Sequence, residues 1–313
     1  MEFFNKNGFK SSWIREGSGK KILFLPGWAE SHSVWKEICP SDLAYEKIFL
    51  NLGGHHPSEF PSGKPQLTLD EFLNSHFDVI NHLADNDKLI LVGHSTGGFI
   101  AMMYTNQFPD KVDKIVLVGS YIEGPIGGLV NLIKLFGEWN FFALPDFIFR
   151  LFQNSKSIFY DVALSVNPIK REEFLNRDYV KEFFPSFFEE YKKMNPKSLR
   201  IVIEILDSIR LSNLQLKENL PLHFIHGDKD PTVPYSQIKN FCDNYKSANL
   251  ITIPDTGHSP HWENPTLFWK YFKKITMRRR RSRILGAKGG MNTESTDKRY
   301  DRFFGFVTTD EHR

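Results

Sequence analysis

The stretch KLILVGHSTGGF (residues 88–99) places an apolar run directly before a Gly-x-Ser-x-Gly turn, and an apolar helical pattern follows. A sharp turn from a strand into a helix holds its middle residue at positive φ and requires small neighbours two residues away. Gly93 and Gly97 are these neighbours, and Gly98 adds clearance. The motif also arises by chance as a purely structural turn, but this context favours Ser95 as a nucleophile presented on the turn.

Further apolar runs surround this one, at residues 20–27, 46–54, 113–120, 220–227 and 248–254. They are apolar throughout rather than alternating, which is typical of parallel strands covered on both faces. Helical patterns fill the gaps between them. We therefore predict an α/β fold with a mostly parallel sheet flanked by helices.

Two segments allow a local prediction. Residues 2–17 contain an Asn-Gly pair between two strand-like runs, which predicts a hairpin. Residues 67–86 have a helical apolar face, with Thr68 as the N-cap and Glu71 three residues later. His76 and His82 lie on this helix and are predicted to be surface or cap histidines.

Residues 121–212 interrupt the alternation of strands and helices. They contain the helical, phenylalanine-rich segments FGEWNFFALPDFIFRLFQ and VKEFFPSFFEEYKKMNP, and no strand-like run follows these segments. We predict that residues 121–212 form a helical cap inserted into a core made of residues 1–120 and 213–277.

The composition changes abruptly at Arg278. Residues 278–313 hold ten Lys or Arg and five Asp or Glu, whereas the other 277 residues hold 30 and 32, respectively. This switch predicts a disordered or foreign basic tail outside the packed domain. Contact of the tail with an anionic surface is the alternative, and we expect no nucleic-acid partner.

The chain shows no signal peptide and no apolar stretch near the ~20 residues of a membrane span. Cys39 and Cys242 lack metal-type spacing and are predicted to be buried free thiols. A reducing cytoplasm suits such thiols, so we predict a cytoplasmic protein.

A serine nucleophile needs a base to take its proton and an acid to orient that base. The segments HGDKDPTVP (226–234) and PDTGHSPHWENP (254–265) each follow a predicted strand, in the chain order Ser, Asp, His. His258 lies in a Gly-His turn at a strand end and is the favoured base. His261, expected to begin the final helix, is the weaker candidate, and His226 is expected to be structural.

Asp230 is the favoured acid, because the following Pro-Thr-Val-Pro restrains its loop. Asp228 is interpreted as a turn residue, and Glu123 is a more distant alternative. The segment LPGWAESHSVW (25–35) supplies an oxyanion turn, since Gly27 lets the backbone approach closely. We predict that the N–H groups of Trp28 and Thr96 stabilise the oxyanion.

The segments PGWAESHSVW, GHSTGG, HGDKDPTVP and GHSPHWENP, in this order, resemble the α/β-hydrolase superfamily. Within it, the chain resembles the capped esterase branch that includes pimeloyl-ACP methyl ester esterase. The resemblance implies an eight-stranded, mostly parallel sheet with its cap at the phenylalanine-rich insertion.

The sequence departs from the family pattern in two places. Pro26-Gly27 stands where the oxyanion turn usually reads His-Gly, so a supporting hydrogen bond is expected to be missing. The segment NLGGHHPSEF (51–60) has Asn51 where an acid is common. His55 and His56 are interpreted first as solvated loop histidines; the alternative is that they form, with Phe99, a wall of the substrate site.

These features predict a serine hydrolase that cleaves carboxylic esters or thioesters through an acyl-enzyme on Ser95, without a metal or an organic cofactor. The cap favours an apolar acyl or alkyl group on a small molecule or an acyl carrier, unless its phenylalanines serve packing alone. The alternatives are an acyltransferase, lyase or cofactor-free perhydrolase on the same residues, and a non-catalytic ligand-binding protein. Branches with an Asp nucleophile, the haloalkane dehalogenases and epoxide hydrolases, are disfavoured by Ser95.

Overall fold

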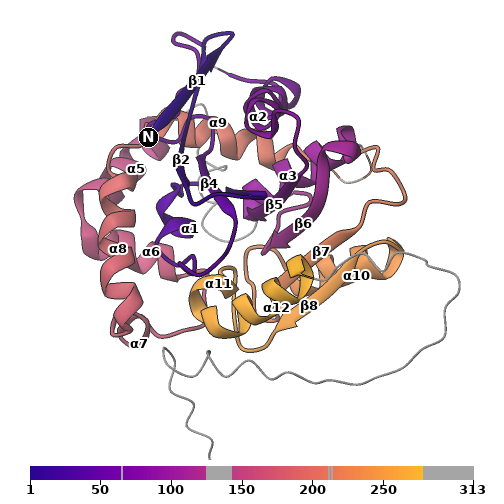
Figure 1. Ribbon diagram of the computed structural model, residues 1–313. Coiled ribbons are helices and arrows are strands. Elements are labelled where there is room, and N and C mark those ends of the chain that lie inside the picture. Colours follow the sequence, from indigo (N-terminus) through magenta and orange to yellow (C-terminus); the bar gives the residue numbers. More distant parts are fainter. Residues whose placement is uncertain (65, 125–142, 211, 213, 278–313) are drawn as a thin grey trace, which may run out of the picture. The chain divides into compact units, whose positions relative to one another are not determined.

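The computed structural model describes residues 1–64, 66–124, 143–210, 212 and 214–277 (Figure 1). The chain divides into two units after Met277. The predicted basic tail, residues 278–313, and part of the predicted cap, residues 125–142, lie outside the described residues.

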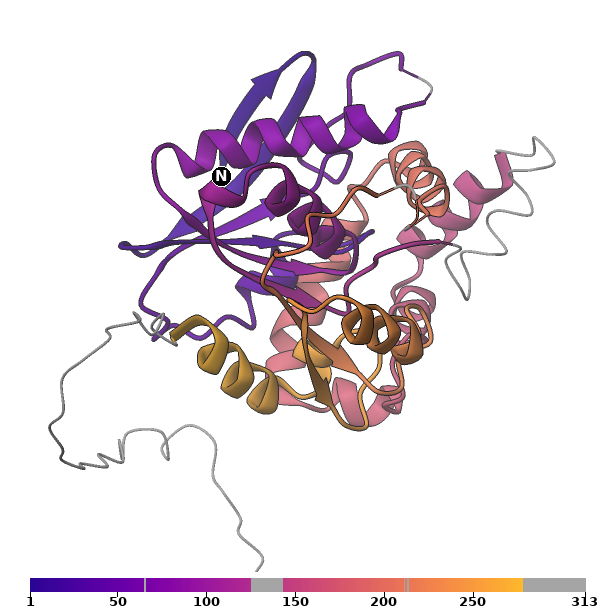
Figure 2. The same cartoon turned by 90° about the vertical axis from the view of Figure 1, so that its right-hand side faces the viewer.

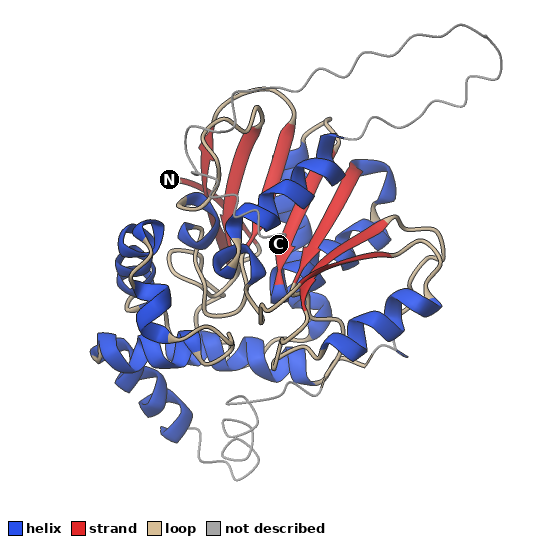
Figure 3. Ribbon diagram, turned by 90° about the horizontal axis from the view of Figure 1, so that it is seen from below, coloured by secondary structure: helices blue, strands red, loops and turns tan. Residues whose placement is uncertain are grey.

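The strands, red in Figure 3, lie side by side in one sheet. It contains eight strands in the order β1-β2-β4-β3-β5-β6-β7-β8. Their bounds are β1 (Glu2–Lys6), β2 (Phe9–Glu16), β3 (Lys21–Leu25), β4 (Glu46–Asn51), β5 (Leu89–His94), β6 (Val112–Val118), β7 (Leu222–Gly227) and β8 (Asn249–Ile253). The pairs β1·β2 and β2·β4 are antiparallel, and all other neighbours are parallel. The predicted fold class is therefore confirmed.

The β1–β2 hairpin turns at Asn7 and Gly8, which both have positive φ, 52° and 82°. This is the conformation that an Asn-Gly pair adopts at low cost, as the sequence predicted. Helix α2 (Leu69–Ala84) runs beside this hairpin (Figure 2), and Lys6 Nζ lies 2.8 Å from Asp78 Oδ1 on the helix. The predicted capping box between Thr68 and Glu71 at the start of α2 is present.

Helices cover both faces of the sheet, because successive residues of each buried strand point to opposite faces. Leu23 and Leu25 of β3 face α2, α3 (Ser95–Gln107) and α10 (Tyr235–Asn244). Ile22 and Phe24 face α1 (Ser33–Lys36) and α12 (Pro265–Met277). The remaining described elements outside residues 121–212 are the short η1 (Pro109–Lys111) and α11 (Pro260–Glu263).

Among the described residues between β6 and β7 there are five helices and no strand. They are α5 (Ala143–Asn154), α6 (Lys156–Leu164), α7 (Arg171–Leu175), α8 (Asp178–Tyr191) and α9 (Pro196–Asp207). Their aromatic side chains pack against one another and against Trp262 of α11, whose ring centroid lies 5.1 Å from that of Phe183 and 5.6 Å from that of Phe187. Much of the phenylalanine content therefore serves packing.

The surface or cap role predicted for His76 is wrong, while His82 is exposed as expected. His76 is buried, and its Nε2 accepts a hydrogen bond from the Gly53 N–H at 2.9 Å. Its Nδ1–H donates to the Phe72 carbonyl at 2.7 Å. Burial lowers the pKa of His76 to about 4, so the ring is neutral and supports the loop after β4.

Candidate active site

Ser95 stands at the junction of β5 and α3 with a φ of +48°. The two flanking glycines make this turn possible. A Cβ on Gly93 would lie 2.5 Å from the Gly98 Cα, and a Cβ on Gly97 would lie 2.5 Å from the Leu25 carbonyl oxygen. Both distances are far below van der Waals contact, so the motif is required by steric crowding at this turn.

Asp230 and His258 come from the loops after β7 and β8, and the structure brings them together. His258 Nδ1 lies 2.8 Å from Asp230 Oδ2, and both side chains are buried. Asp230 Oδ1 accepts the N–H groups of Thr232 and Val233 at 2.8 and 2.9 Å.

This environment determines the protonation of the pair. Burial by itself raises the pKa of Asp230, but His258, His226 and the Val233 N–H outweigh it and lower the pKa below its usual value. The ionised carboxylate accepts hydrogen bonds only, so His258 carries its proton on Nδ1. In the neutral form of the ring, Nε2 then has the lone pair that a general base requires.

None of the rival candidates lines the cavity that contains Ser95. Asp228 and Lys229 are exposed in the turn before Asp230, and Glu123 lines a different cavity. His226 is buried, and its Nε2–H donates to the Val233 carbonyl at 2.9 Å. His261 is fully buried and stacks on Trp35, with ring centroids 4.5 Å apart.

The oxyanion turn follows β3, beside the start of α3. Ala29, with a φ of +61°, donates its N–H to His55 Nε2 at 3.0 Å. Within the described residues, the backbone N–H groups of Trp28 and Thr96 have no protein acceptor. Both residues line the same cavity as Ser95.

The alternative wall of His55, His56 and Phe99 is not found, since none of the three lines the cavity that contains Ser95. The favoured solvated position is wrong for His55. His55 is fully buried behind the oxyanion turn, and burial lowers its pKa to about 4. His56 is half-buried in the loop after β4. Phe99 packs in the core between α3 and the sheet, with its ring centroid 6.3 Å from that of Tyr121. These positions follow from the path of the backbone, which the sequence pattern did not reveal.

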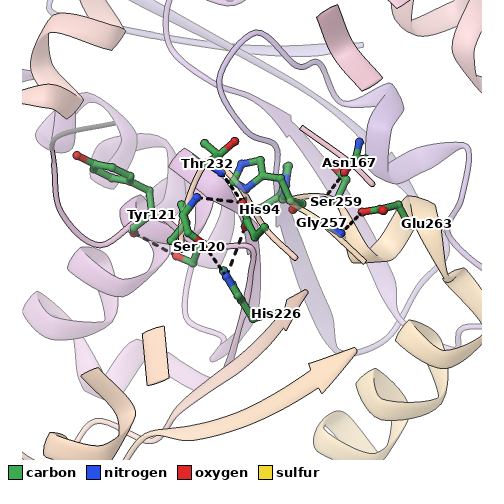
Figure 4. Close-up of polar contacts among 12 residues, drawn as sticks. His94, Ser120, Tyr121, Asn167, His226, Thr232, Gly257, Ser259 and Glu263 are labelled. Atoms are coloured by element: carbon green, nitrogen blue, oxygen red, sulfur yellow. Dashed lines mark hydrogen bonds and ion pairs between the residues drawn. The ribbon is translucent and has the colours of Figure 1, made fainter. Parts of the chain in front are cut away.

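Two residues of the insertion, Val166 and Asn167, support the loop that carries His258. The sequence pattern did not indicate these contacts. The His258 N–H donates to the Val166 carbonyl at 3.0 Å, and the Ser259 N–H donates to Asn167 Oδ1 at 3.1 Å (Figure 4). On the other side, Glu263 Oε1 accepts the Gly257 N–H at 2.7 Å. The position of the base therefore depends on residues from both the core and the insertion.

Ser95 and His258 share one cavity of about 250 Å³. Most of its lining is apolar, and most of the apolar side chains come from the insertion. Among the described residues, the lining contains no Lys or Arg side chain. The aromatic and aliphatic members are Trp28, Tyr121, Phe149, Phe152, Phe159, Val162, Val166, Phe187, Tyr191, Ile203, Leu206 and Trp262. The indole N–H of Trp28 donates to the Leu199 carbonyl at 2.8 Å, which ties the oxyanion turn to α9.

In the part of the chain that the structure describes, no group of His, Cys, Asp and Glu side chains is arranged to hold a metal ion. Across the same ranges, every helix is too short or too polar to cross a membrane. Cys39 and Cys242 are unpaired and half-buried, and burial raises their thiol pKa values to about 12 and about 11.

Comparison with known proteins agrees with this architecture. Pimeloyl-[acyl-carrier protein] methyl ester esterase of Wigglesworthia glossinidia brevipalpis is 26% identical over 275 residues, which cover 83% of this chain and 95% of the relative. A thermophilic esterase from Thermogutta terrifontis superposes with a TM-score of 0.64 at 18% identity, over 85% of this chain and 94% of that one. The enol-lactonase from Burkholderia xenovorans LB400 superposes with a TM-score of 0.68 at 15% identity, over 88% and 100%. Because residues 20–265 also match the family described as alpha/beta hydrolase fold, the chain belongs to that family.

Proposed function

We propose that the protein is a serine esterase that uses Ser95 as nucleophile, His258 as general base and Asp230 as the acid that orients the base. One observation carries this proposal. Ser95, at positive φ, and His258, held by the buried Asp230, come from segments distant in sequence and line one apolar cavity. A structural turn alone would need neither the base nor the acid.

In the proposed reaction, Ser95 Oγ attacks the acyl carbon of the ester while its proton passes to His258 Nε2. The alcohol then leaves with that proton, and the acyl group stays on Ser95. Water, deprotonated by the same Nε2, attacks the acyl-enzyme and releases the acid. Asp230 keeps the Nδ1–H tautomer of His258 in place and stabilises the imidazolium that forms in each half-reaction.

The N–H groups of Trp28 and Thr96 are the proposed oxyanion donors. Thr96 is the second residue of α3, where the helix dipole also favours negative charge. A single donor of this kind supplies about 2.7–4 kcal/mol of transition-state stabilisation.

The cavity supports an apolar acyl or alkyl group as substrate. An apolar cavity of about 150 Å³ holds a benzene molecule, so this cavity accommodates roughly ten heavy atoms. The relative from Wigglesworthia is named for the methyl ester of an acyl-carrier-bound acid. The proposed substrates are therefore esters or thioesters, with the acyl group carried either by an acyl carrier or by a small molecule. Residues 121–212 as a cap and a cytoplasmic location remain predictions.

Labelling with a fluorophosphonate probe tests the nucleophile. Ser95→Ala is expected to abolish labelling and ester turnover. Ser165→Ala is the matched control, because Ser165 lines the same cavity; it is expected to label like the native protein. Labelling that persists in Ser95→Ala would refute the assignment.

A panel of p-nitrophenyl esters and acyl thioesters of graded length tests the substrate class. We expect kcat/KM to rise up to an acyl chain of roughly ten heavy atoms and then to fall. A preference for acetate, or for chains that end in a carboxylate, would contradict the apolar assignment.

A further inference from the structure

The missing histidine of the oxyanion turn has a counterpart in the structure. Glu30 Oε2 accepts the Gly27 N–H at 2.5 Å and lies 2.9 Å from His94 Nδ1. Both side chains are buried, with 6% of Glu30 and 2% of His94 exposed. Glu30 thus gives the oxyanion turn a supporting hydrogen bond, and His94, next to Ser95, is its partner.

With Glu30 ionised, the charge of His94 follows from its hydrogen-bond partners. The other ring nitrogen of His94, Nε2, lies 3.0 Å from the His258 carbonyl oxygen, which can only accept a hydrogen bond. The ionised Glu30 carboxylate, whose Oε2 already accepts the Gly27 N–H, can only accept a hydrogen bond from His94 as well. Both nitrogens of His94 therefore face acceptors, and both contacts are hydrogen bonds only when the ring carries two protons.

We propose that Glu30 and His94 form a buried carboxylate–imidazolium pair that positions the oxyanion turn and the backbone of His258. Glu30 acts through the Gly27 N–H on the turn that presents the Trp28 N–H. His94 acts through the His258 carbonyl. Both are positioning residues, and their role rests on the proposed esterase function.

Charged groups around His94 are consistent with the pair. Burial lowers the pKa of His94, but the Glu30 carboxylate and Asp230 outweigh burial and raise it above the usual value. Facing His94 are also the rings of His258 and His261, with centroids 5.0 and 4.6 Å away. His226 faces the same group and, like His261, has its pKa lowered by burial, so both rings are neutral.

The charge balance matters for the reaction. An unpaired Glu30 carboxylate beside the oxyanion turn would repel the negative charge that develops on the substrate oxygen. The imidazolium of His94 cancels that charge and leaves the Trp28 N–H free to stabilise the oxyanion.

Glu30→Gln tests the pair, because glutamine has the same shape but no charge. In this variant one amide group, either the carbonyl oxygen or the NH2, takes the Oε2 position. The oxygen can accept the Gly27 N–H but cannot donate to Nδ1 of a neutral His94, and the NH2 group can donate to Nδ1 but cannot accept the Gly27 N–H. At least one of the three buried hydrogen bonds is lost. Glu37→Gln is the matched control, since Glu37 is exposed seven residues further along the chain.

Two measurements are made on the full chain. In ¹⁵N NMR of histidine-labelled protein, the His94 signal, identified by its absence in His94→Gln, is expected at the imidazolium position in native protein at pH 7. It is expected at a neutral position in Glu30→Gln. With p-nitrophenyl butyrate, Glu30→Gln is expected to lower kcat about 10- to 100-fold with KM within about twofold, less than the loss of a whole oxyanion donor.

The outcomes separate the two proposals. A neutral His94 in the native protein, or Glu30→Gln with kcat within twofold of native, would overturn the pair. Native protein without ester turnover or Ser95 labelling would overturn the esterase function, while the NMR signal would still decide the pair. If Glu30→Gln does not fold, the spectrum of native protein alone decides the charge state of His94.

Discussion

Asp230→Asn is the substitution whose effect follows most directly from the geometry. The Oδ1 atom of Asp230 accepts two backbone N–H groups, from Thr232 and Val233, at 2.8 and 2.9 Å. The asparagine carbonyl must keep this position, because an NH2 group there would face two donors. The NH2 group therefore takes the Oδ2 position, 2.8 Å from His258 Nδ1.

An NH2 group at that position can only donate, so His258 must accept on Nδ1 and move its proton to Nε2. That proton then occupies the lone pair that should receive the proton of Ser95. The wrong tautomer lowers kcat by about 10⁴-fold in a serine-protease triad, which corresponds to about 5 kcal/mol of activation free energy. We expect a decrease of this size in kcat with KM nearly unchanged.

The assay is steady-state hydrolysis of p-nitrophenyl butyrate, together with urea unfolding of the same preparations. The free energy of unfolding should change by less than about 2 kcal/mol, because both backbone hydrogen bonds are retained. Asp228→Asn is the matched control, since Asp228 is exposed two residues away. An Asp230→Asn variant within tenfold of native kcat, or an equal loss in Asp228→Asn, would refute the tautomer argument.

Three further predictions concern stability, each measured by urea unfolding. Gly97→Ala places a Cβ 2.5 Å from the Leu25 carbonyl, so we expect a loss of about 3 kcal/mol. Gly63→Ala, strained by its φ of +79° but with open space around it, should lose only about 1 kcal/mol, and equal losses would exclude the clash as the cause. Burial raises the pKa of Glu263 to about 7. The contribution of this carboxyl group to the free energy of unfolding is therefore fully present below pH 4.5 and is lost as the pH rises through 7. Glu263→Gln should therefore gain up to about 3 kcal/mol relative to native between pH 5 and 8, and a constant difference would contradict this. The pKa of His76 is lowered to about 4, so its contribution is present above pH 6.5 and is lost as the pH falls through 4. The native protein should lose up to about 3 kcal/mol more than His76→Gln over that interval, and parallel curves would count against a neutral buried ring.

Local chemistry explains why much of the fold could be predicted. The continuous apolar runs, the Asn-Gly turn and the Thr68–Glu71 cap each act within a few residues, so their consequences are visible in the sequence. The crowding around Ser95 is of the same kind, because the carbonyl of Leu25 lies where any side chain on Gly97 would project. The order of the candidate residues Ser95, Asp230 and His258 along three strand ends also predicted that they would meet at one edge of a parallel sheet.

Side-chain partners across the fold were harder to predict. His55 and His56 were interpreted as solvated loop histidines, with a substrate wall that includes Phe99 as the alternative. The loop after β4 instead turns His55 under the oxyanion turn, where its Nε2 accepts the Ala29 N–H. His76 was predicted to be a surface or cap residue but is buried against the loop after β4. A helical pattern does not show which loop packs on a given face of the helix. The cavity lining depends on how α5 to α9 pack over the site, and sequence periodicity does not contain that information.

The sequence by itself determined the α/β fold, the turn at Ser95 and the candidate set of nucleophile, base and acid, because strand patterning and glycine requirements are local. Only the tertiary structure decided which groups share a proton or a hydrogen bond. Glu30 and His94 are 64 residues apart and meet at 2.9 Å. Asn167 and Ser259 are 92 residues apart and meet at 3.1 Å. Such contacts depend on distances across the packed core, which fix protonation and orientation and which no single stretch of sequence specifies.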